Sequence, residues 1–263
     1  MNDLRSDTRV VVALDHSLHW GVHEGFENPR ATLEAVLDGD PDGVLASVSL
    51  IRQFPELFEA YPAVERIATL DLIHDSTVPG IRDDGEIHSQ VFTAREAARV
   101  GADAAKVAVV YGRTRESVLR DNIEFAAKAA EKCRSTGIPL VIEPTLWGSR
   151  IDDELDPERL TDAARIAFEL GADVIKSPYP GTEADFTPIG NELPVPVYIA
   201  GGPAVESDRA VLEMVAGAVE DGARGVMFGR NVWQRPDPAA MIDAIDAVIR
   251  GTKTVGEADA MLP

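Results

Sequence analysis

A lysine stands at the C-terminal end of a short apolar run in the second half of the chain. Val174 and Ile175 precede Lys176 and the Pro-rich residues 177–181 follow it, so we expect a buried strand that delivers Lys176 to its end. Lysine is scarce, with five copies among the 25 lysines and arginines. A buried amine is stable when it is neutral or ion-paired. Lys176 is therefore either a nucleophile or the partner of a carboxylate.

Other apolar runs end near residues that would support a nucleophilic amine, namely Lys106, Glu143 and Asp15. A neighbouring ammonium favours the neutral form of an amine, so Lys106 would promote attack by Lys176. Imine chemistry also needs a proton carrier, a role that suits Glu143, and Asp15 could orient a substrate hydroxyl or take its proton. The alternative is a Lys–Glu–Lys ion network that satisfies buried charges without catalysis.

Eight apolar runs recur along the chain, with helical patterns between them. Their starts lie roughly 20–40 residues apart, the spacing of a strand plus a crossover helix. Each run is continuously apolar, as expected of parallel strands covered on the outside. We predict one (β/α)8 TIM barrel, a single α/β domain over residues 1–263. A doubly wound open sheet is the alternative, but no G-x-G-x-x-G follows the first run. The runs are 10–14, 43–46, 66–72, 104–110, 140–143, 173–176, 195–200 and 225–228.

Capping signals between these runs agree with the expected helices. A cap residue precedes proline at three helix starts, two Thr-x-x-Glu sequences fit capping boxes, and glycine stands at five helix ends. The cap residues are Asn28, Asp156 and Asp237, the boxes begin at Thr93 and Thr254, and the glycines are Gly101, Gly137, Gly171, Gly222 and Gly251.

Glycine-rich turns follow the last two runs. Gly201 and Gly202 come after the seventh run, and Gly229 and Arg230 come after the eighth. Loops at these places in a (β/α)8 barrel commonly hold phosphate through backbone N–H groups, and a side chain on the glycine would block that approach. Arg230 would add a bidentate contact. Tight turns alone are the alternative explanation, but both turns together predict a phosphorylated substrate.

Three histidines follow the first run within eight residues: His16, His19 and His23. Three imidazoles could bind a divalent metal, but loop spacing alone does not fix ligand geometry. Gly21 and the lack of apolar periodicity predict a loop here. We expect His16 to shape the active site, the other two histidines to be loop residues, and no metal to be required.

The segment 73–88 after the third run is long for a connection in this fold. Long loops on the C-terminal face often contact substrate. Arg82 would then meet a second anionic group of the substrate, or it would form a surface salt bridge.

The composition limits the partners and the cellular location that we expect for this protein. A formal charge of −20 argues against nucleic acid and anionic membranes as partners, and 45% hydrophobic residues suit a globular chain with a sizeable core. No apolar stretch fits a secretory signal or a membrane span, and the one cysteine, Cys133, excludes a disulfide framework. We therefore expect a cytoplasmic protein. Its acidic, lysine-poor surface suggests adaptation to high salt.

Several motifs together resemble the class I aldolase superfamily of archaeal-type fructose-bisphosphate, tagatose-bisphosphate and deoxyribose-phosphate aldolases. The similarity spans nearly the whole chain. It rests on Ala-Leu-Asp-His at 13–16, Ala-Asp-Val-Ile-Lys-Ser-Pro-Tyr at 172–179, Tyr-Ile-Ala-Gly-Gly-Pro at 198–203 and the segment 222–234. The last two motifs also look like the aminodideoxyheptulosonate synthase relatives of this group. The resemblance implies that Lys176 is the Schiff-base lysine, that Asp15 is the substrate aspartate and that the protein is a homo-oligomer.

One departure concerns the turn after the fifth run. The archaeal group usually carries a catalytic tyrosine there in Tyr-Pro-Arg-Gly, whereas residues 142–148 are Ile-Glu-Pro-Thr-Leu-Trp-Gly. The Glu143–Pro144 pair and Lys106 look instead like the tagatose-bisphosphate and sulfofructose-phosphate branch, where a Lys–Glu pair serves the proton transfers. Schiff-base chemistry is thus implied more firmly than fructose bisphosphate.

These observations predict a metal- and cofactor-independent class I aldolase of carbohydrate metabolism, such as glycolysis. It would reversibly cleave a phosphorylated ketose, resembling fructose 1,6-bisphosphate, to dihydroxyacetone phosphate and an aldehyde. The expected catalytic residues are Lys176, Glu143, Lys106 and Asp15, and the expected binding residues are His16, Gly201, Gly202, Gly229 and Arg230. The alternatives are an aldolase or transaldolase for another sugar phosphate (tagatose, sulfofructose or aminodideoxyheptulosonate type), a sugar-phosphate lyase or isomerase without an imine, and a noncatalytic phosphometabolite-binding protein.

Overall fold

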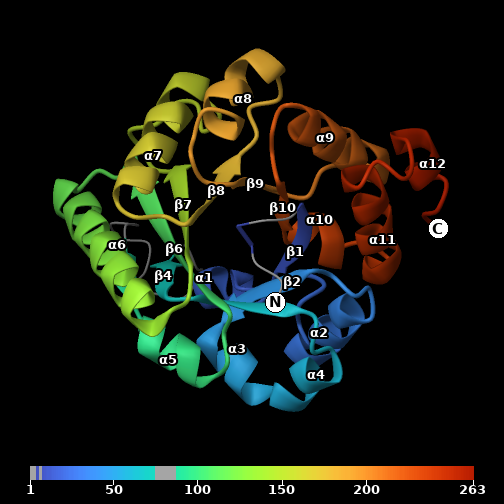
Figure 1. Ribbon diagram of the computed structural model, residues 1–263, viewed down its shortest axis with the longest axis horizontal. Coiled ribbons are helices and arrows are strands. Elements are labelled where there is room, and N and C mark those ends of the chain that lie inside the picture. The colour runs from blue at the N-terminus through green and yellow to red at the C-terminus, as the bar shows by residue number, and fades with distance from the viewer. Residues whose placement is uncertain (1–3, 6–7, 75–86) are drawn as a thin grey trace.

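The computed structural model describes residues 4–5, 8–74 and 87–263. Within these ranges, eight parallel strands close into a barrel in the order β1-β10-β9-β8-β7-β6-β3-β2 (Figure 1). This confirms the (β/α)8 barrel predicted from the spacing of the apolar runs. The strands are β1 (Arg9–Ala13), β2 (Gly43–Ser47), β3 (Glu65–Thr69), β6 (Ala104–Tyr111), β7 (Leu140–Leu146), β8 (Val174–Pro178), β9 (Val197–Ala200) and β10 (Gly225–Phe228).

Helices surround the barrel, and their predicted starts and ends are confirmed. The side chains of Asn28, Asp156 and Asp237 each accept a hydrogen bond from a first-turn backbone N–H. Both capping boxes form, and all five helix-end glycines have positive φ. None of the helices in the described part of the chain is long and apolar enough to cross a membrane. The longer helices are α2 (Pro29–Leu37), α3 (Val48–Gln53), α4 (Pro55–Ala60), α5 (Ala94–Arg99), α6 (Glu116–Thr136), α7 (Pro157–Glu169), α8 (Glu183–Gly190), α9 (Asp208–Glu220) and α11 (Pro238–Ile249); shorter ones are α1 (His16–Trp20), α10 (Arg230–Trp233) and α12 (Val255–Asp259).

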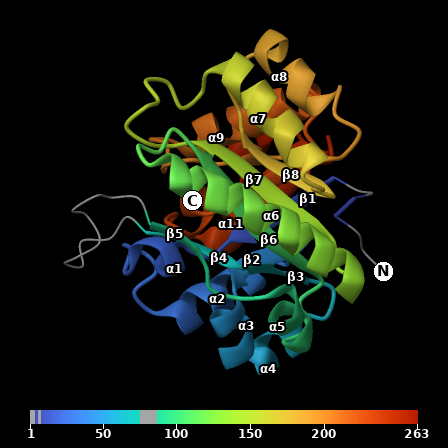
Figure 2. The ribbon, with the colours of Figure 1, turned by 90° about the vertical axis from the view of Figure 1, so that its left-hand side faces the viewer.

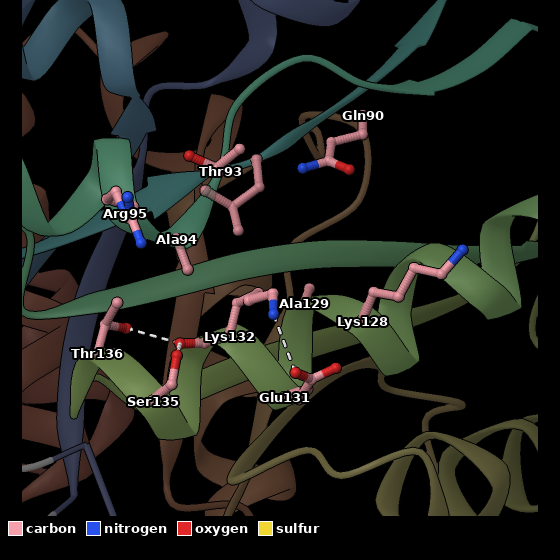
Figure 3. A pocket seen from close by; sticks show the side chains of 11 residues that line it. Gln90, Thr93, Ala94, Arg95, Lys128, Ala129, Glu131, Lys132, Ser135 and Thr136 are labelled. Carbon is pink, nitrogen blue, oxygen red and sulfur yellow. Dashed lines mark hydrogen bonds and ion pairs between the residues drawn. The ribbon is translucent and has the colours of Figure 1, made fainter.

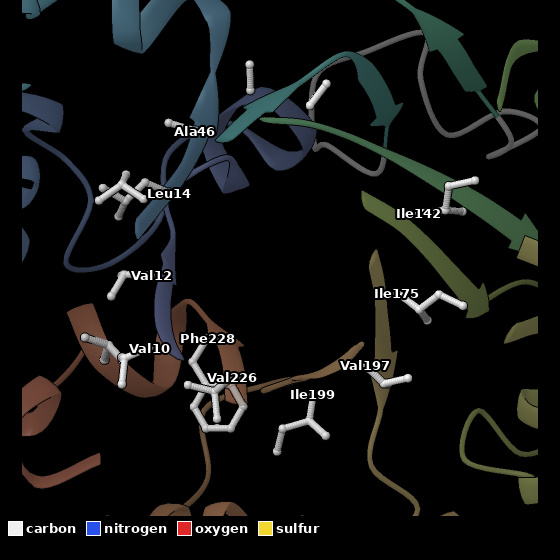
Figure 4. Close-up of a cluster of buried hydrophobic side chains, with 14 of the residues drawn as sticks. Val10, Val12, Leu14, Ala46, Ile142, Ile175, Val197, Ile199, Val226 and Phe228 are labelled. Carbon is white, nitrogen blue, oxygen red and sulfur yellow. The ribbon is translucent and has the colours of Figure 1, made fainter. Parts of the chain in front are cut away.

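Strand side chains alternate between the helices and the barrel axis. Outward-pointing residues pack beneath the helices, as Figure 4 shows for Val10, Val12, Ile142, Ile175 and Val197. The inward-pointing ones form a separate buried layer that fills the barrel as a packed core. That layer contains Val11, Ala13, Leu45, Ile67, Ala104, Val141, Val174, Tyr198 and Met227.

The next inward positions, two residues further along, are polar on most strands; the exceptions are Ala200 on β9 and Gly229 after β10. Because side chains in a strand alternate with period two, these residues stand directly above the apolar layer, toward the C-terminal ends. Strand register pairs Thr69 with Lys106 across β3 and β6. Glu143 contacts both Lys106 and Lys176, so the polar residues meet in the mouth of the barrel. The members of this polar layer are Asp15, Thr69, Lys106, Glu143 and Lys176.

Leu4 covers the opposite end of the barrel. It is 2% exposed and packs with the inward apolar layer. Its carbonyl oxygen accepts a hydrogen bond of 3.0 Å from the Tyr198 hydroxyl. Tyr198 and Leu4 both belong to the inward apolar layer, so this cover lies beneath the polar layer.

The third predicted run is divided in the structure. β3 ends at Thr69, and β4 (Asp71–His74) begins an antiparallel hairpin with β5 (Ile87–Gln90) that the sequence did not predict. The hairpin stands at the same end of the barrel as α1 (Figure 2). It is short and outside the barrel, so it lacks the apolar run by which the other strands were recognised. Arg82, expected to contact a second anionic group, lies outside the described residues.

Two further boundaries differ from the prediction. Residues 16–20 form the short helix α1 rather than a loop. β7 continues past Pro144 to Leu146, where the sequence predicted a turn, and Pro144 stays in register with Val109. Proline has a φ that suits extended backbone and loses only its N–H donor, so it did not end the strand here.

Candidate active site

Two lysines share one glutamate in the barrel mouth. Nζ of Lys176 lies 2.8 Å from Oε1 of Glu143, and Nζ of Lys106 lies 2.8 Å from Oε2. Glu143 is on β7, between the strands that carry the two lysines. All three residues are less than a tenth exposed. The structure brings the three residues together, with the carboxylate of Glu143 between the two amines.

Asp15 extends this network on its other side. Its Oδ2 atom accepts a hydrogen bond of 2.7 Å from the Thr69 hydroxyl and lies 3.6 Å from Nζ of Lys106. His19 Nε2 is 3.4 Å from the same oxygen. The other oxygen, Oδ1, is 3.7 Å from His16 Nδ1. Four strands and α1 therefore deliver one connected set of ionisable groups.

The network has a defined charge distribution at neutral pH. Burial alone would raise the pKa of Glu143, but Lys106 and Lys176 lower it to about 2. Burial would likewise raise the pKa of Asp15, but Lys106 and the hydrogen bond from His19 hold it well below its ordinary value. Burial would lower the pKa of Lys106, yet Glu143, Asp15 and Asp71 raise it. Lys106 is thus a permanent cation between two carboxylates.

His16 is a buried neutral group beside this network. Burial lowers its pKa to about 3, with the nearby cations Lys176 and Arg230 acting in the same direction against Asp15. Its ring packs against Trp233 with centroids 5.2 Å apart. A Cβ on Gly229 would collide with this ring, reaching 2.7 Å from Nε2. Gly229 is therefore required for packing against His16, a reason that the phosphate argument from sequence did not include.

The loops after β9 and β10 are joined by one buried asparagine. Asn231 donates from Nδ2 to the carbonyl oxygens of Gly201 (2.7 Å) and Pro203 (3.2 Å), and its Oδ1 accepts from the Val205 backbone N–H (2.9 Å). Gly202 has φ of +63° and open space where a Cβ would lie. These contacts bring the two predicted glycine turns side by side.

Arg230 begins the short helix after the second of these turns. Its guanidinium lies 5.6 Å from the Trp20 ring centroid, the side chain is half-buried, and burial lowers its pKa. Trp20 in turn faces Trp147 from the loop after β7, with centroids 6.3 Å apart. Arg230 is therefore a cation held beside an aromatic wall at the mouth.

The three N-terminal histidines have different roles. His19 uses Nε2 toward Asp15, and its Nδ1 accepts a hydrogen bond of 3.1 Å from the Ile73 backbone N–H. It is not the plain loop residue that the sequence suggested. His23 packs edge-on against Trp20. No group of three or more His, Cys, Asp or Glu side chains in the described ranges has the arrangement of a metal site.

A buried Asp–His pair fixes the β4–β5 hairpin. Asp71 Oδ2 accepts from the Ala108 backbone N–H (2.8 Å) and lies 2.6 Å from His88 Nε2. Asn122 of α6 donates to the Ala108 carbonyl (2.8 Å) and accepts from the Val110 N–H (2.9 Å). These contacts make Asp71 an anchor of the hairpin on β6.

Sequence reasoning missed three residues of the site: Thr69, His19 and Asn231. Thr69 is two residues before Asp71 and two after the inward Ile67, so strand period could have placed it. His19 is four residues after Asp15, a spacing that faces it once α1 is known to be helical. Asn231 follows the second glycine turn and had no signal beyond its position.

A groove on the outside of the barrel is separate from this site. It has a volume of about 700 Å³ and lies between the start of α5 and the length of α6 (Figure 3). Lys128 and Lys132 line it, and they pair with Glu124 and Glu131 of their own helix. The groove shares no residue with the mouth network.

The arrangement at the mouth supports one type of chemistry. Lys176 contacts the ionised carboxylate of Glu143, which can carry protons. Lys106 contacts the other oxygen of that carboxylate and approaches Asp15, a second carboxylate. Glycine turns and an arginine stand on the β9–β10 side of the mouth. A (β/α)8 barrel that gathers these groups is the architecture of the class I aldolase superfamily.

The chain belongs to the DeoC/LacD family of aldolases, whose family model matches residues 9–235. It is 34% identical over 257 residues to a class 1 fructose-bisphosphate aldolase of Halobacterium salinarum, covering 95% of this chain and 93% of that one. It is 32% identical over 255 residues to 2-amino-4,5-dihydroxy-6-oxo-7-(phosphonooxy)heptanoate synthase of Streptomyces griseus, covering 97% and 89%.

A solved structure also supports membership of the aldolase superfamily. An archaeal fructose-1,6-bisphosphate aldolase, with its catalytic lysine covalently bound to the carbinolamine intermediate of the substrate, superposes with a TM-score of 0.79 at 26% identity. The superposition covers 92% of this chain and 94% of that chain. The predicted superfamily is therefore confirmed, and the protein is an aldolase. Because the relatives carry out different reactions, the family alone leaves the substrate open.

Proposed function

We propose that this aldolase forms a Schiff base at Lys176 and reversibly cleaves a phosphorylated ketose to dihydroxyacetone phosphate and an aldehyde. The single observation that carries the proposal is the 2.8 Å contact between Nζ of Lys176 and Oε1 of Glu143. It joins a buried amine to an ionised proton acceptor in the mouth of an aldolase barrel. The archaeal relative with a lysine-bound carbinolamine supports the same chemistry.

Imine formation follows from this contact. The ion-paired Lys176 first gives a proton to Glu143, and its nitrogen then attacks the C2 carbonyl carbon of the substrate. Glu143 passes this proton to the carbonyl oxygen, which becomes the carbinolamine hydroxyl. Glu143 next accepts a second proton from the nitrogen and gives it to that hydroxyl, which leaves as water and gives the iminium ion. Lys106, 2.8 Å from the other carboxylate oxygen, keeps Glu143 ionised between these transfers.

Carbon–carbon cleavage needs a second base. Asp15 accepts the proton of the C4 hydroxyl, the C3–C4 bond breaks, and its electron pair moves into the iminium to form an enamine. The aldehyde departs, the enamine carbon is protonated, and water releases dihydroxyacetone phosphate from Lys176. Asp15 is ionised for this step because Lys106 and His19 hold its pKa well below the ordinary value, against the effect of burial.

We place the phosphate of the dihydroxyacetone half against the turns at Gly201, Gly202, Gly229 and Arg230. The support is that Asn231 holds the first turn next to the second, and that Arg230 supplies a cation there. His16 lines the site as a neutral ring, so it adds no positive charge that would attract a second anionic group of the substrate. The chemistry uses the lysine as its electron sink, so we propose that it requires no metal or other cofactor.

Trapping with borohydride tests this proposal. The protein is incubated with dihydroxyacetone phosphate and borohydride, digested and analysed by mass spectrometry. We expect one covalent adduct, on Lys176, and none in a Lys176→Met variant. Lys128→Met, on the outer groove, is the matched control and should be trapped as the wild type is. An unmodified Lys176, with intact protein and active reductant, would overturn the mechanism.

A second substrate has support from one specific feature. Residues 142–148 contain no tyrosine, whereas the archaeal fructose-bisphosphate group usually carries one in the turn after this strand, and a relative at 32% identity is a phosphonooxyheptanoate synthase. An aldol reaction on another sugar phosphate would use the same lysine and carboxylates. Retro-aldol assays over fructose, tagatose, deoxy- and sulfo-sugar phosphates, and the aldol direction with amino-aldehydes, distinguish the candidates. Chelator sensitivity together with borohydride resistance would point instead to a lyase or isomerase without an imine.

We also propose the setting in which this enzyme works. The chain forms a single barrel domain, acts in the cytoplasm within carbohydrate metabolism, such as glycolysis, and assembles as a homo-oligomer. Its charge of −20 suits high salt, where repulsion between carboxylates is screened. Thermal stability and activity that peak in molar salt would support this, and maxima at low salt would contradict it. Light scattering of the purified protein measures the oligomeric state.

A further inference from the structure

The two oxygens of the Asp15 carboxylate have different surroundings. Oδ2 lies 2.7 Å from the Thr69 hydroxyl, 3.4 Å from His19 Nε2 and 3.6 Å from Lys106 Nζ. Oδ1 is approached by His16 Nδ1 at 3.7 Å, beyond hydrogen-bond distance. Asp15 is 4% exposed, so its side chain is held by these neighbours rather than by water.

The proton of His19 can be assigned from its partners. The Ile73 backbone N–H donates to Nδ1 at 3.1 Å, so Nδ1 carries a lone pair in the neutral ring. The proton of that neutral ring is then on Nε2, which points at Asp15 Oδ2. The backbone of β4 therefore sets the tautomer in which His19 donates to the carboxylate.

The donor on β4 is itself held in place. Asp71, two residues before Ile73, accepts the Ala108 N–H of β6 at 2.8 Å, and His88 on the partner strand lies 2.6 Å from the same Asp71 oxygen. His19 is 4% exposed and Thr69 is fully buried. The contacts to Oδ2 thus come from three elements: His19 of α1, which the hairpin orients, Thr69 of β3 and Lys106 of β6.

We propose that His19 is a positioning residue for the aldol step: together with Thr69 it engages Oδ2 of Asp15, so that Oδ1 is the oxygen that accepts the proton of the substrate hydroxyl. This inference rests on the proposed function, in which Asp15 is the base for carbon–carbon cleavage. A carboxylate fixed through one oxygen cannot turn about its Cβ–Cγ bond without losing those bonds. The lone pairs of Oδ1 therefore keep one orientation toward the substrate.

Two substitutions separate the two hydrogen bonds of His19. In His19→Asn the amide oxygen can replace Nδ1 as the acceptor for Ile73, but the side chain is too short to reach Asp15. In His19→Gln the amide nitrogen can replace Nε2 as the donor to Asp15, while the Ile73 bond is lost. A role in cleavage predicts that asparagine is harmful and that glutamine restores function. A role confined to holding the hairpin predicts the reverse.

The experiment measures cleavage and imine formation separately. For His19→Asn we expect kcat of retro-aldol cleavage to fall about 10- to 100-fold, because the base is present but misoriented. Borohydride trapping of dihydroxyacetone phosphate on Lys176 should stay within about threefold of the wild type, since it bypasses Asp15. His19→Gln should cleave within about fivefold of the wild type. Thr69→Val should resemble His19→Asn, and Thr69→Ser should resemble the wild type.

His23→Asn is the matched control. His23 stands on the same segment and packs against Trp20 without a polar contact to Asp15, so its loss should leave cleavage within about threefold. Thermal melting of every variant identifies any that fails to fold. If a His19 variant fails to fold, the comparison of Thr69→Val with Thr69→Ser tests the inference. Wild-type cleavage by His19→Asn, or equal loss in the asparagine and glutamine variants, would overturn the inference. Absence of trapping in the wild type would instead overturn the proposed function.

Discussion

Nζ of Lys176 and Oε1 of Glu143 lie 2.8 Å apart in a part of the barrel mouth where both residues are less than a tenth exposed. The pair is not isolated, because the second Glu143 oxygen contacts Lys106, which in turn approaches Asp15. Removing one member of such a buried network leaves another charge without compensation. Substitutions here should therefore change both catalysis and stability, and the two effects can be measured separately.

Glu143→Gln removes the proposed proton carrier with little change in shape. We expect kcat of retro-aldol cleavage to fall by about 10²- to 10⁴-fold, the usual contribution of a general acid–base group. The free energy of unfolding should fall by about 3–5 kcal/mol, because two lysines lose their shared carboxylate. Urea unfolding at pH 7 measures it. Glu131→Gln, which breaks the exposed pair with Lys132, is the control and should leave the unfolding midpoint unchanged.

The acid stability of the wild type should depend on Glu143. Its pKa falls from the ordinary 4.5 to about 2 in the folded protein, despite burial, because of Lys106 and Lys176. A depressed carboxyl pKa contributes stability that is present above pH 4.5 and lost as pH falls toward 2. In Glu143→Gln this loss is absent, so the difference in unfolding free energy between the two proteins should shrink over that window. A constant difference from pH 5 to pH 2 would contradict the assignment.

His16 should not titrate in the range usual for histidine. Burial, with Lys176 and Arg230, lowers its pKa from 6.5 to about 3. Its ring signals in NMR should therefore stay constant between pH 8 and pH 4.5. The unfolded chain takes up this proton first as pH falls below 6.5, so the neutral buried ring contributes stability that is lost between pH 6.5 and pH 3. A midpoint for His16 near pH 6.5 would show that the ring is solvated.

Gly229→Ala should destabilise the protein mainly through His16. A Cβ there would collide with the His16 ring and would also lie 3.0 Å from the Ala13 carbonyl oxygen. We expect a loss of about 1–3 kcal/mol, as for other overpacked sites. In a His16→Ala background most of this loss should disappear, and the part caused by the Ala13 contact should remain. Gly256→Ala, where nothing lies within 4 Å of the added Cβ, is the control.

Asn231→Ala should loosen the loop after β9. The substitution removes bonds to Gly201, Pro203 and Val205 at the proposed phosphate site. We expect KM for phosphorylated substrates to rise about 10-fold or more with a smaller change in kcat, since binding is lost in ground and transition states alike. Unphosphorylated substrate analogues should show no such rise. A rise of equal size for both substrate types would indicate general damage to the mouth.

The barrel and the main charged residues were predictable because both follow from strand pattern. Eight apolar runs defined the strands, and Lys106, Glu143 and Lys176 interrupt such runs at the height where the apolar layer stops. Thr69 was not recognised, because threonine is common in strands and carries no charge. His19 was missed because α1 is five residues long and shows no apolar period. The β4–β5 hairpin depends on Asp71 and His88, 17 residues apart, a contact that no local pattern reveals.

The cover formed by Leu4 and Tyr198 has a kinetic consequence. It closes the barrel beneath Lys176, so in the proposed reaction the substrate and both products exchange at the end where the strands terminate. In that reaction the aldehyde holds no covalent bond to the enzyme after cleavage, whereas the ketone half is still an enamine of Lys176. We therefore expect ordered release, with the aldehyde leaving first and acting as a noncompetitive product inhibitor against the ketose, while dihydroxyacetone phosphate inhibits competitively.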